Sequence, residues 1–172
     1  AKIFATVGSL EKKNFLMDTY KLEEEQIFFS RDMSFAQGIQ AATDGQGVDV
    51  ALNSLSGDAL QATFECVAPF GRFIELGKRD ITSNSRLEMA HFNKNLSFAS
   101  VDLGMVREKR PQLTKRLLRD AFKLFVDTDA QSRWPVTTLP ISEVEAGFRA
   151  LQGGQVIGKM VVQVTDDSMV KV

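Results

Sequence analysis

The stretch at residues 48–76 reads VDVALNSLSGDALQATFECVAPFGRFIEL. Residues 48–52 are almost continuously apolar, which is typical of a strand buried in a parallel sheet. A helix is expected over residues 58–67, and Pro69 should end it before a second strand at residues 72–76. A strand, a helix and a strand in this order predict a right-handed βαβ unit.

The same alternation continues on both sides of this stretch. Short apolar and β-branched runs predict further strands at residues 2–7, 27–29, 96–101 and 159–164. Apolar residues at helical spacing predict helices near residues 11–20, 34–43, 111–125 and 142–152, two of which open with capping boxes at Ser34 and Ser142. This rhythm predicts a doubly wound α/β fold with a parallel sheet over residues 1–164, followed by a polar linker at 165–172.

Composition sets limits on function. The chain has 172 residues, of which 44% are apolar and 25% are charged, and its formal net charge is −1. Such a chain is expected to be a soluble globular domain with neither a nucleic acid nor a membrane as partner. Cys66 and His91 are single residues of their kinds, which argues against a disulfide, a zinc site or a Ser-His-Asp triad. We therefore expect no metal and a cytoplasmic location.

Basic residues gather in one segment of the chain. Seven of them lie between Arg107 and Lys123, against two acids. The helical spacing of the apolar residues around them places most of these charges on a solvated helix face. A weak docking surface for an acidic partner is the alternative interpretation.

The end of the strand predicted at residues 2–7 indicates a preference among nucleotides. Ser9 is followed by Lys12 and Lys13, and Glu11 is the only acid nearby. An acid close to such a strand accepts hydrogen bonds from the ribose hydroxyl of NAD, whereas a phosphate there needs cations and donors. These residues favour NADPH, with a simple solvated helix start as the alternative.

Two more segments follow predicted strands. Residues 53–58 follow one strand and residues 76–80 the next, and ligands of parallel α/β sheets bind beyond these carboxyl ends. Lys78 lies in the second segment, and Asp102 follows the strand at 96–101 in the same way. Judged from the residues alone, Lys78 and Asp102 are equally well explained as generic loop residues.

Five blocks stand out in order along the chain: FATVGS at 4–9, VDVALNSLSG at 48–57, GRFIELGKRD at 71–80, FASVD at 98–102 and IGKMVV at 157–162. Together they resemble the enoyl reductase domain of reducing polyketide synthases, chiefly the fungal iterative type, and are similar to animal fatty acid synthase. That family is a zinc-free branch of the medium-chain dehydrogenase/reductase superfamily. The resemblance therefore implies a Rossmann-like NADP-binding domain without a metal.

The resemblance also implies a reaction. NADPH would deliver a hydride to the β-carbon of an α,β-unsaturated thioester, held by phosphopantetheine on an acyl carrier protein, and a proton would then reach the α-carbon. Lys78 and Asp102 match the implied catalytic pair, as proton donor or as groups that stabilise and orient the enolate. Other synthase domains and a second copy in a homodimer are the further implied partners.

The cofactor contacts implied by the same blocks fall into three groups. They are Ser9, Lys12 and Arg31 around the 2′-phosphate, Ser54, Leu55, Gly77 and Lys78 along the nicotinamide, and Lys159 from the last strand. These assignments come from the match of the five blocks to the family and not from the spacing of the residues.

One departure from the family pattern is large. Family domains carry, ahead of the block at residues 4–9, a strand that leads into a glycine-rich pyrophosphate turn, and before it a substrate-binding subdomain. The sequence shows neither, so the NADP-binding domain is expected to be incomplete at its N-terminus. In the order 3-2-1-4-5-6 that strand is central, and residues 2–7 and 48–52 would lack the neighbour that should pair with both. We therefore expect the isolated chain to be poorly stable and catalytically silent.

Two other functions remain open at this point. One is a free-standing, zinc-free quinone or enone oxidoreductase of the same superfamily. The other is a non-catalytic structural remnant, for instance one that supplies a dimer edge near residues 96–101. Lys78 and the polar residues after Val164, which suit a connection to another domain, favour the cofactor-domain portion of a synthase enoyl reductase.

Overall fold

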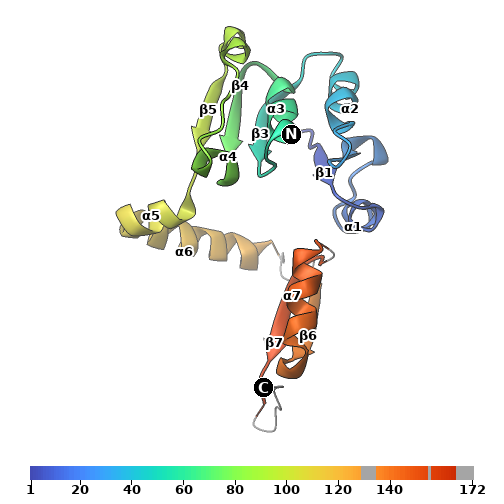
Figure 1. The fold of residues 1–172 in the computed structure, drawn as a ribbon, viewed down its shortest axis with the longest axis vertical. Helices are drawn as coiled ribbons and strands as arrows, with labels where there is room; N and C mark the ends of the chain where they lie inside the picture. The colour runs from blue at the N-terminus through green and yellow to red at the C-terminus, as the bar shows by residue number, and fades with distance from the viewer. Residues whose placement is uncertain (129–134, 155, 166–172) are drawn as a thin grey trace. The chain divides into compact units, whose positions relative to one another are not determined.

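The computed structural model describes residues 1–128, 135–154 and 156–165 (Figure 1). The chain divides into two compact units, Ala1–Thr114 and Lys115–Val172, each with parallel strands of its own. Helices alternate with the strands along the chain, and every described strand pair is parallel. The predicted α/β class with parallel strands is therefore confirmed. Residues 166–172 of the expected linker lie outside the described residues.

The first unit begins with a two-stranded sheet. β1 (Ala5–Val7) pairs with β2 (Ile27–Phe29), and the connection runs through α1 (Leu10–Tyr20) and a 3-10 turn at Glu24–Gln26. Ser9 caps α1, because its Oγ accepts a hydrogen bond from the backbone N–H of Lys12 at 3.4 Å. The short strand, turn and helix predicted for this segment are thus observed.

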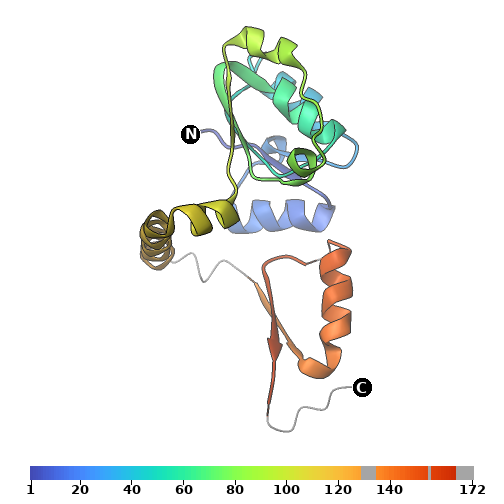
Figure 2. The same cartoon turned by 60° about the vertical axis from the view of Figure 1, so that its left-hand side comes forward.

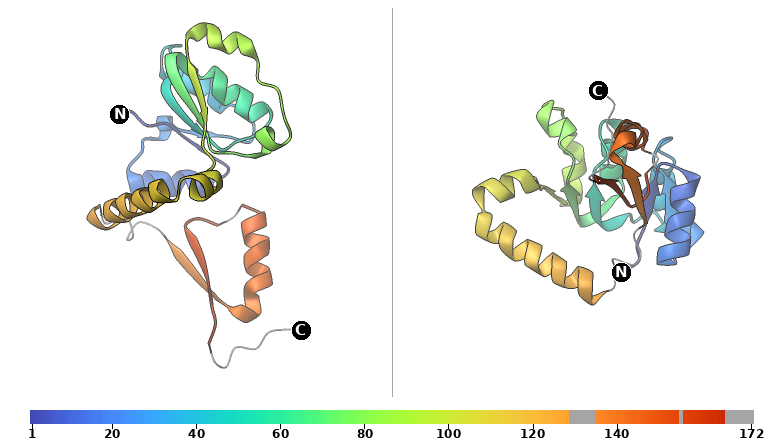
Figure 3. Two further views of the ribbon diagram at one scale, coloured as in Figure 1. Left: turned by 90° about the vertical axis from the view of Figure 1, so that its left-hand side faces the viewer. Right: turned by 90° about the horizontal axis from the view of Figure 1, so that it is seen from below.

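A second, three-stranded sheet follows in the same unit (Figures 2 and 3). Its strands, in spatial order, are β3 (Val48–Asn53), β4 (Val67–Glu75) and β5 (Ser97–Ser100). The helical segments around them are α2 (Phe35–Ala42), α3 (Asp58–Glu65), α4 (Arg79–Thr82) and a 3-10 helix at Met89–Lys94. Because all three strands are parallel, their carboxyl ends meet at one edge of the sheet.

Aromatic rings fill the core of this sheet. Phe64 of α3 and Phe73 of β4 are completely buried, and their rings meet edge-on with centroids 5.0 Å apart. Phe73 also stacks on Phe98 of β5, at 5.4 Å between centroids. Since such pairs contribute about 0.5–1.5 kcal/mol beyond the area they bury, this cluster holds α3 firmly on β4 and β5.

A cavity of about 970 Å³ lies between β1 and β3. Residues of β1, α2 and β3 line it, among them Thr6, Phe35 and Leu52. Within the described residues β1 pairs only with β2, and β3 only with β4, so the strand edges that border the cavity have no neighbour. The prediction that these two strands lack a shared partner is confirmed, and the first unit accordingly holds two sheets.

The boundary between α3 and β4 differs from the prediction. α3 ends at Glu65 and β4 follows almost at once, so Pro69 lies inside a strand and not at a helix end. The pairing of β4 with β3 shifts register between Val48 and Val50. A proline has no N–H to donate, and it fits a segment where the ladder is already irregular.

Both predicted capping boxes are wrong. The Ser34 hydroxyl donates to Asp32 Oδ1 at 2.7 Å and makes no capping bond to α2. α7 (Val144–Gln152) begins after a 3-10 turn at Ile141–Glu143, which places Ser142 inside that turn. Serine competes readily for such local bonds, so the pattern alone does not fix where a helix starts.

The second unit contains a parallel pair, β6 (Val136–Pro140) and β7 (Lys159–Gln163), connected by α7. α6 (Pro111–Asp127) begins in the first unit and continues into the second. Most of its apolar residues are exposed, among them Leu118 by 66% and Phe122 by 69%. No helix within the described ranges is long and apolar enough to cross a bilayer.

The buried thiol of Cys66 gives a first testable prediction. Burial, and to a smaller extent Glu65, raise the pKa of Cys66 to about 11, and 1% of the residue is exposed. Because the thiolate is the reactive form, iodoacetamide at pH 8 should alkylate the folded chain at least about tenfold more slowly than the urea-unfolded chain. Mass spectrometry of timed samples measures both rates, and equal rates would show that Cys66 is not buried in solution.

Candidate active site

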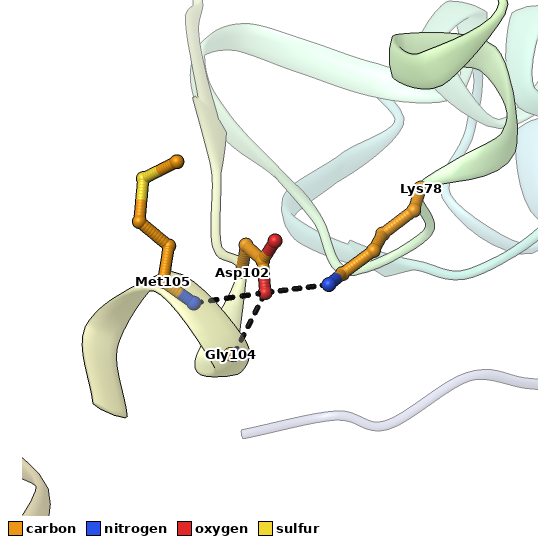
Figure 4. A network of polar contacts seen from close by, with 4 residues as sticks. All are labelled: Lys78, Asp102, Gly104 and Met105. Atoms are coloured by element: carbon orange, nitrogen blue, oxygen red, sulfur yellow. Dashed lines mark hydrogen bonds and ion pairs between the residues drawn. The ribbon is translucent and has the colours of Figure 1, made fainter. Parts of the chain in front are cut away.

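Lys78 and Asp102 come together where β4 and β5 end. Lys78 follows β4, Asp102 follows β5, and Lys78 Nζ lies 2.7 Å from Asp102 Oδ1 (Figure 4). The same oxygen accepts hydrogen bonds from the backbone N–H groups of Gly104 at 2.7 Å and Met105 at 3.2 Å, because Asp102 caps α5 (Leu103–Lys109). Three donors therefore fix this carboxylate.

The hydrogen bond between Lys78 and Asp102 stabilises the charged form of the Asp102 carboxyl. The hydrogen bond from Lys78 has the largest effect and lowers the pKa of the Asp102 carboxyl. Desolvation opposes it as the second-largest effect, and the N–H groups of Met105 and Gly104 lower the pKa further. The side chain of Lys78 remains 59% exposed and that of Asp102 33%. An ammonium that is anchored on one side and accessible on the other can donate a proton or stabilise a developing negative charge.

The turns after β3 and β4 lie next to this pair. Ser54 is exposed and Leu55 half-buried in the first turn, and Gly77 precedes Lys78 in the second. The backbone N–H of Gly57 donates to Asp80 Oδ2 at 3.0 Å, which ties the two turns together. The segments at 53–58 and 76–80 thus share one edge of the sheet, as predicted from the sequence.

Sequence reasoning missed two residues at the strand ends that precede these turns. Asn53 and Glu75, the last residues of β3 and β4, are each only 2% exposed and bind each other through Asn53 Nδ2 and Glu75 Oε2 at 2.6 Å. The sequence did contain a signal for this pair, because a polar residue at the end of an apolar strand in a buried sheet needs a polar partner.

A second group of polar residues surrounds the end of β1. The guanidinium of Arg31 lies over Gly8, since a Cβ built on that glycine would be 3.5 Å from Arg31 Nε. Among the described residues, neither Arg31 nor Lys12 forms an ion pair, whereas the neighbouring Lys13 binds Glu24 at 3.0 Å. A hydroxyl and two cations without ion pairs among the described residues, all near the end of β1 in the chain or in space, are the kinds of group that bind a phosphate.

Lys159 belongs to the second unit. It is exposed and opens β7, where it lies opposite Val136 of β6, and its backbone N–H donates to the Pro135 carbonyl at 2.9 Å. Its expected contact with the cofactor therefore stays a prediction.

The sequence matches the family described as zinc-binding dehydrogenase over residues 22–162. Highly-reducing polyketide synthase 1 of Aureobasidium melanogenum is 54% identical over 162 residues, which is 94% of this chain and 7% of that protein. The chain thus spans only a small part of this curated relative. The family's description names zinc, but the described residues contain no group of three or more His, Cys, Asp or Glu side chains placed to hold a metal.

Solved structures place the match more narrowly. The CurK enoyl reductase has a TM-score of 0.76 and 31% identity, over 96% of this chain and 48% of that chain. The nucleotide-binding subdomain of the PpsC enoylreductase domain from Mycobacterium tuberculosis has a TM-score of 0.67 and 39% identity, over 74% and 70% of the two chains. The chain therefore belongs to the zinc-binding dehydrogenase family and corresponds to the nucleotide-binding part of the enoyl reductase region of fungal highly reducing polyketide synthases.

Proposed function

We propose that the chain is the cofactor-domain portion of an NADPH-dependent enoyl reductase, which reduces the α,β double bond of enoyl thioesters bound to a carrier protein. The observation that carries this proposal is the Lys78–Asp102 pair, 2.7 Å apart, at the strand ends where parallel α/β sheets bind ligands. The family supplies the reaction class, and the pair supplies the groups that the second half of the reaction needs.

The chemistry divides between cofactor and protein. NADPH, when bound, supplies the hydride for the β-carbon. Lys78 Nζ carries the proton that goes to the α-carbon, and its charge stabilises the negative charge that develops on the thioester oxygen. Asp102 is a positioning residue for that ammonium, and Lys78 regains its proton from solvent, to which its side chain is open.

Two polar groups in the first unit would hold the cofactor. Ser9, Lys12 and Arg31 would bind the 2′-phosphate, because a hydroxyl and two cations without ion pairs among the described residues are the donors that a phosphate dianion needs. Ser54, Leu55, Gly77 and Lys78 would line the nicotinamide side, and we also assign Lys159 to the cofactor.

Titration of NADPH fluorescence tests the proposal. The present chain is compared with one extended upstream through the glycine-rich turn, and we expect tight binding by the extended chain only. Lys12→Ala should weaken NADPH binding by about 10- to 100-fold, since a hydrogen bond to a charged group contributes about 1.5–3 kcal/mol. NADH binding should change little, because NADH has no 2′-phosphate.

Lys13→Ala is the matched control. It removes the same charge from the next residue, but the Lys13 ammonium binds Glu24 at 3.0 Å, so NADPH affinity should be unchanged. Failure of both the present and the extended chain to bind NADPH would remove the cofactor assignment and favour a structural remnant.

The partners follow from the same proposal. An acyl carrier protein would present the enoyl group on phosphopantetheine, and other synthase domains would lie on the same polypeptide in the cytoplasm. We also propose a homodimer through the outer edge of β5, which has no neighbouring strand among the described residues.

A further inference from the structure

Two polar side chains are buried in the sheet beneath the proposed active site. Among the described residues, Asn53 and Glu75 are the polar or charged residues that fall in the buried class, and each is 2% exposed. They are the last residues of β3 and β4 and lie opposite each other in the strand register. The proposed reaction uses neither of them.

Their hydrogen bonds lead into both turns of the site. Asn53 Nδ2 donates to Glu75 Oε2 at 2.6 Å and to the Leu55 carbonyl at 2.8 Å, while Asn53 Oδ1 accepts from the Leu55 N–H at 3.2 Å. Glu75 Oε1 accepts from the N–H of Gly77. The partners settle the orientation of the Asn53 amide, because its oxygen faces an N–H group and its nitrogen faces two oxygens.

Gly77 is shaped by the same carboxylate. A Cβ at that position would lie 2.6 Å from Glu75 Oε1, so any other residue would push this carboxylate out of the place where the turn closes over it. Lys78 is the next residue, and its direction therefore depends on a turn that the Glu75 carboxylate closes from below.

Glu75 also reaches the strand that carries Asp102. Its backbone carbonyl accepts a hydrogen bond from the N–H of Val101 at 2.9 Å, one residue before Asp102. The backbone N–H of Leu76 donates to the Asn53 carbonyl at 2.8 Å. One residue thus connects the ends of β3, β4 and β5, which are the three strand ends that form the site.

Sheet stability alone does not explain these two residues. Phe73, two positions earlier on the same strand, is completely buried among apolar rings. A further apolar pair could continue that packing, whereas a buried carboxylate with neutral donors loses its hydration. What the polar pair adds is a fixed conformation for two turns.

We infer that Glu75, together with Asn53, is a positioning residue that holds the turns after β3 and β4 so that Lys78 meets Asp102 and the first turn keeps its place beside the cofactor. The inference rests on the proposed function. In Glu75→Gln the side chain keeps its shape but presents an NH₂ group either to the Gly77 N–H or to the Asn53 NH₂, so one of the two bonds is lost.

The test uses the full-length polypeptide and two readouts. Steady-state kinetics with NADPH and the crotonyl thioester of pantetheine give kcat and KM, and reductive methylation followed by mass spectrometry gives the reactivity of Lys78. For Glu75→Gln we expect a fall in kcat of about tenfold or more, because small misplacements of reacting groups can cost up to about 100-fold. Lys78 should become about threefold more reactive as its ion pair loosens.

Phe73→Leu is the matched control, since it disturbs the same strand without touching a polar bond. It should lower thermal stability while leaving kcat, KM and Lys78 reactivity within about twofold of the unchanged protein. Asn53→Ser is the second variant and is measured in the same way, in case Glu75→Gln does not fold. It should also lower kcat and raise the reactivity of Lys78.

The outcomes separate the two proposals. The positioning role would be overturned if Glu75→Gln and Asn53→Ser matched Phe73→Leu in both the kinetics and the methylation of Lys78. This holds whether or not the unchanged protein reduces enoyl thioesters. If the unchanged protein reduces no enoyl thioester, the proposed reaction fails. The methylation readout then still decides whether Glu75 positions Lys78, because it needs no turnover.

Discussion

Extending the chain upstream by the strand that family domains carry ahead of residues 4–9 is expected to raise its free energy of unfolding by at least about 3 kcal/mol. The strand would fill the 970 Å³ cavity and pair with the free edges of β1 and β3. Each satisfied backbone hydrogen bond contributes about 0.5–1.5 kcal/mol net, and such a strand makes several on each side. It would also cover Val50 and Leu52, which are 46% and 71% exposed.

Calorimetry of the two chains measures this effect. For a protein of this size, 3 kcal/mol corresponds to a rise in Tm of about 6–12 °C. The control is an extension of the same length and composition in which a proline interrupts the strand, because proline cannot donate to the ladder. Equal Tm values for the present and the extended chain would contradict the assignment of the cavity to a strand. We also expect the present chain, without that strand, to show no enoyl reduction.

The strands were the most predictable part of this fold. Apolar runs such as residues 48–52 indicated strands correctly, and the helices between them favour parallel pairing. The burial expected for this run is only partly observed, because Val50 and Leu52 are exposed in β3. Helix starts were less predictable, because the Ser34 hydroxyl bonds to Asp32 and Ser142 lies inside a 3-10 turn, and neither outcome can be read from the capping pattern. Pro69 was misread for a related reason, since an irregular strand tolerates proline as well as a helix end does.

The site was predictable where it depends on strand ends. Lys78 and Asp102 follow adjacent parallel strands, so their meeting follows from topology once the strand order is known. The strand order itself came from the resemblance and not from periodicity. Asn53 and Glu75 were missed because a hydrophobicity pattern gives no role to a polar residue near the end of a strand, whereas these two side chains are buried against each other.

Replacing Lys78 by methionine is expected to lower kcat for enoyl thioester reduction in the full-length polypeptide by about 100- to 10,000-fold. Methionine keeps an unbranched apolar stem but carries no proton and no charge. The change should reside in kcat, because the missing charge acts when negative charge develops on the substrate. KM for NADPH should change far less than kcat. The incorporation of solvent deuterium at the α-carbon, followed by NMR, should slow in parallel with kcat.

The variant Asp102→Asn separates the effect of the Asp102 charge from the effect of its hydrogen bonds. All three donors contact Oδ1, and an asparagine oxygen can accept the same bonds, so this variant removes the charge and keeps the geometry. We expect a smaller fall in kcat, of about tenfold, because the ammonium stays near its place. Lys109→Met is the matched control, since the Lys109 ammonium pairs with its neighbour Glu108 on the surface at 2.6 Å and with no other acid among the described residues. A Lys78→Met variant that reduces enoyl thioesters as fast as Lys109→Met would show that the proton comes from another group. The Lys78–Asp102 pair would then be no more than a surface ion pair, whose contribution to stability is small.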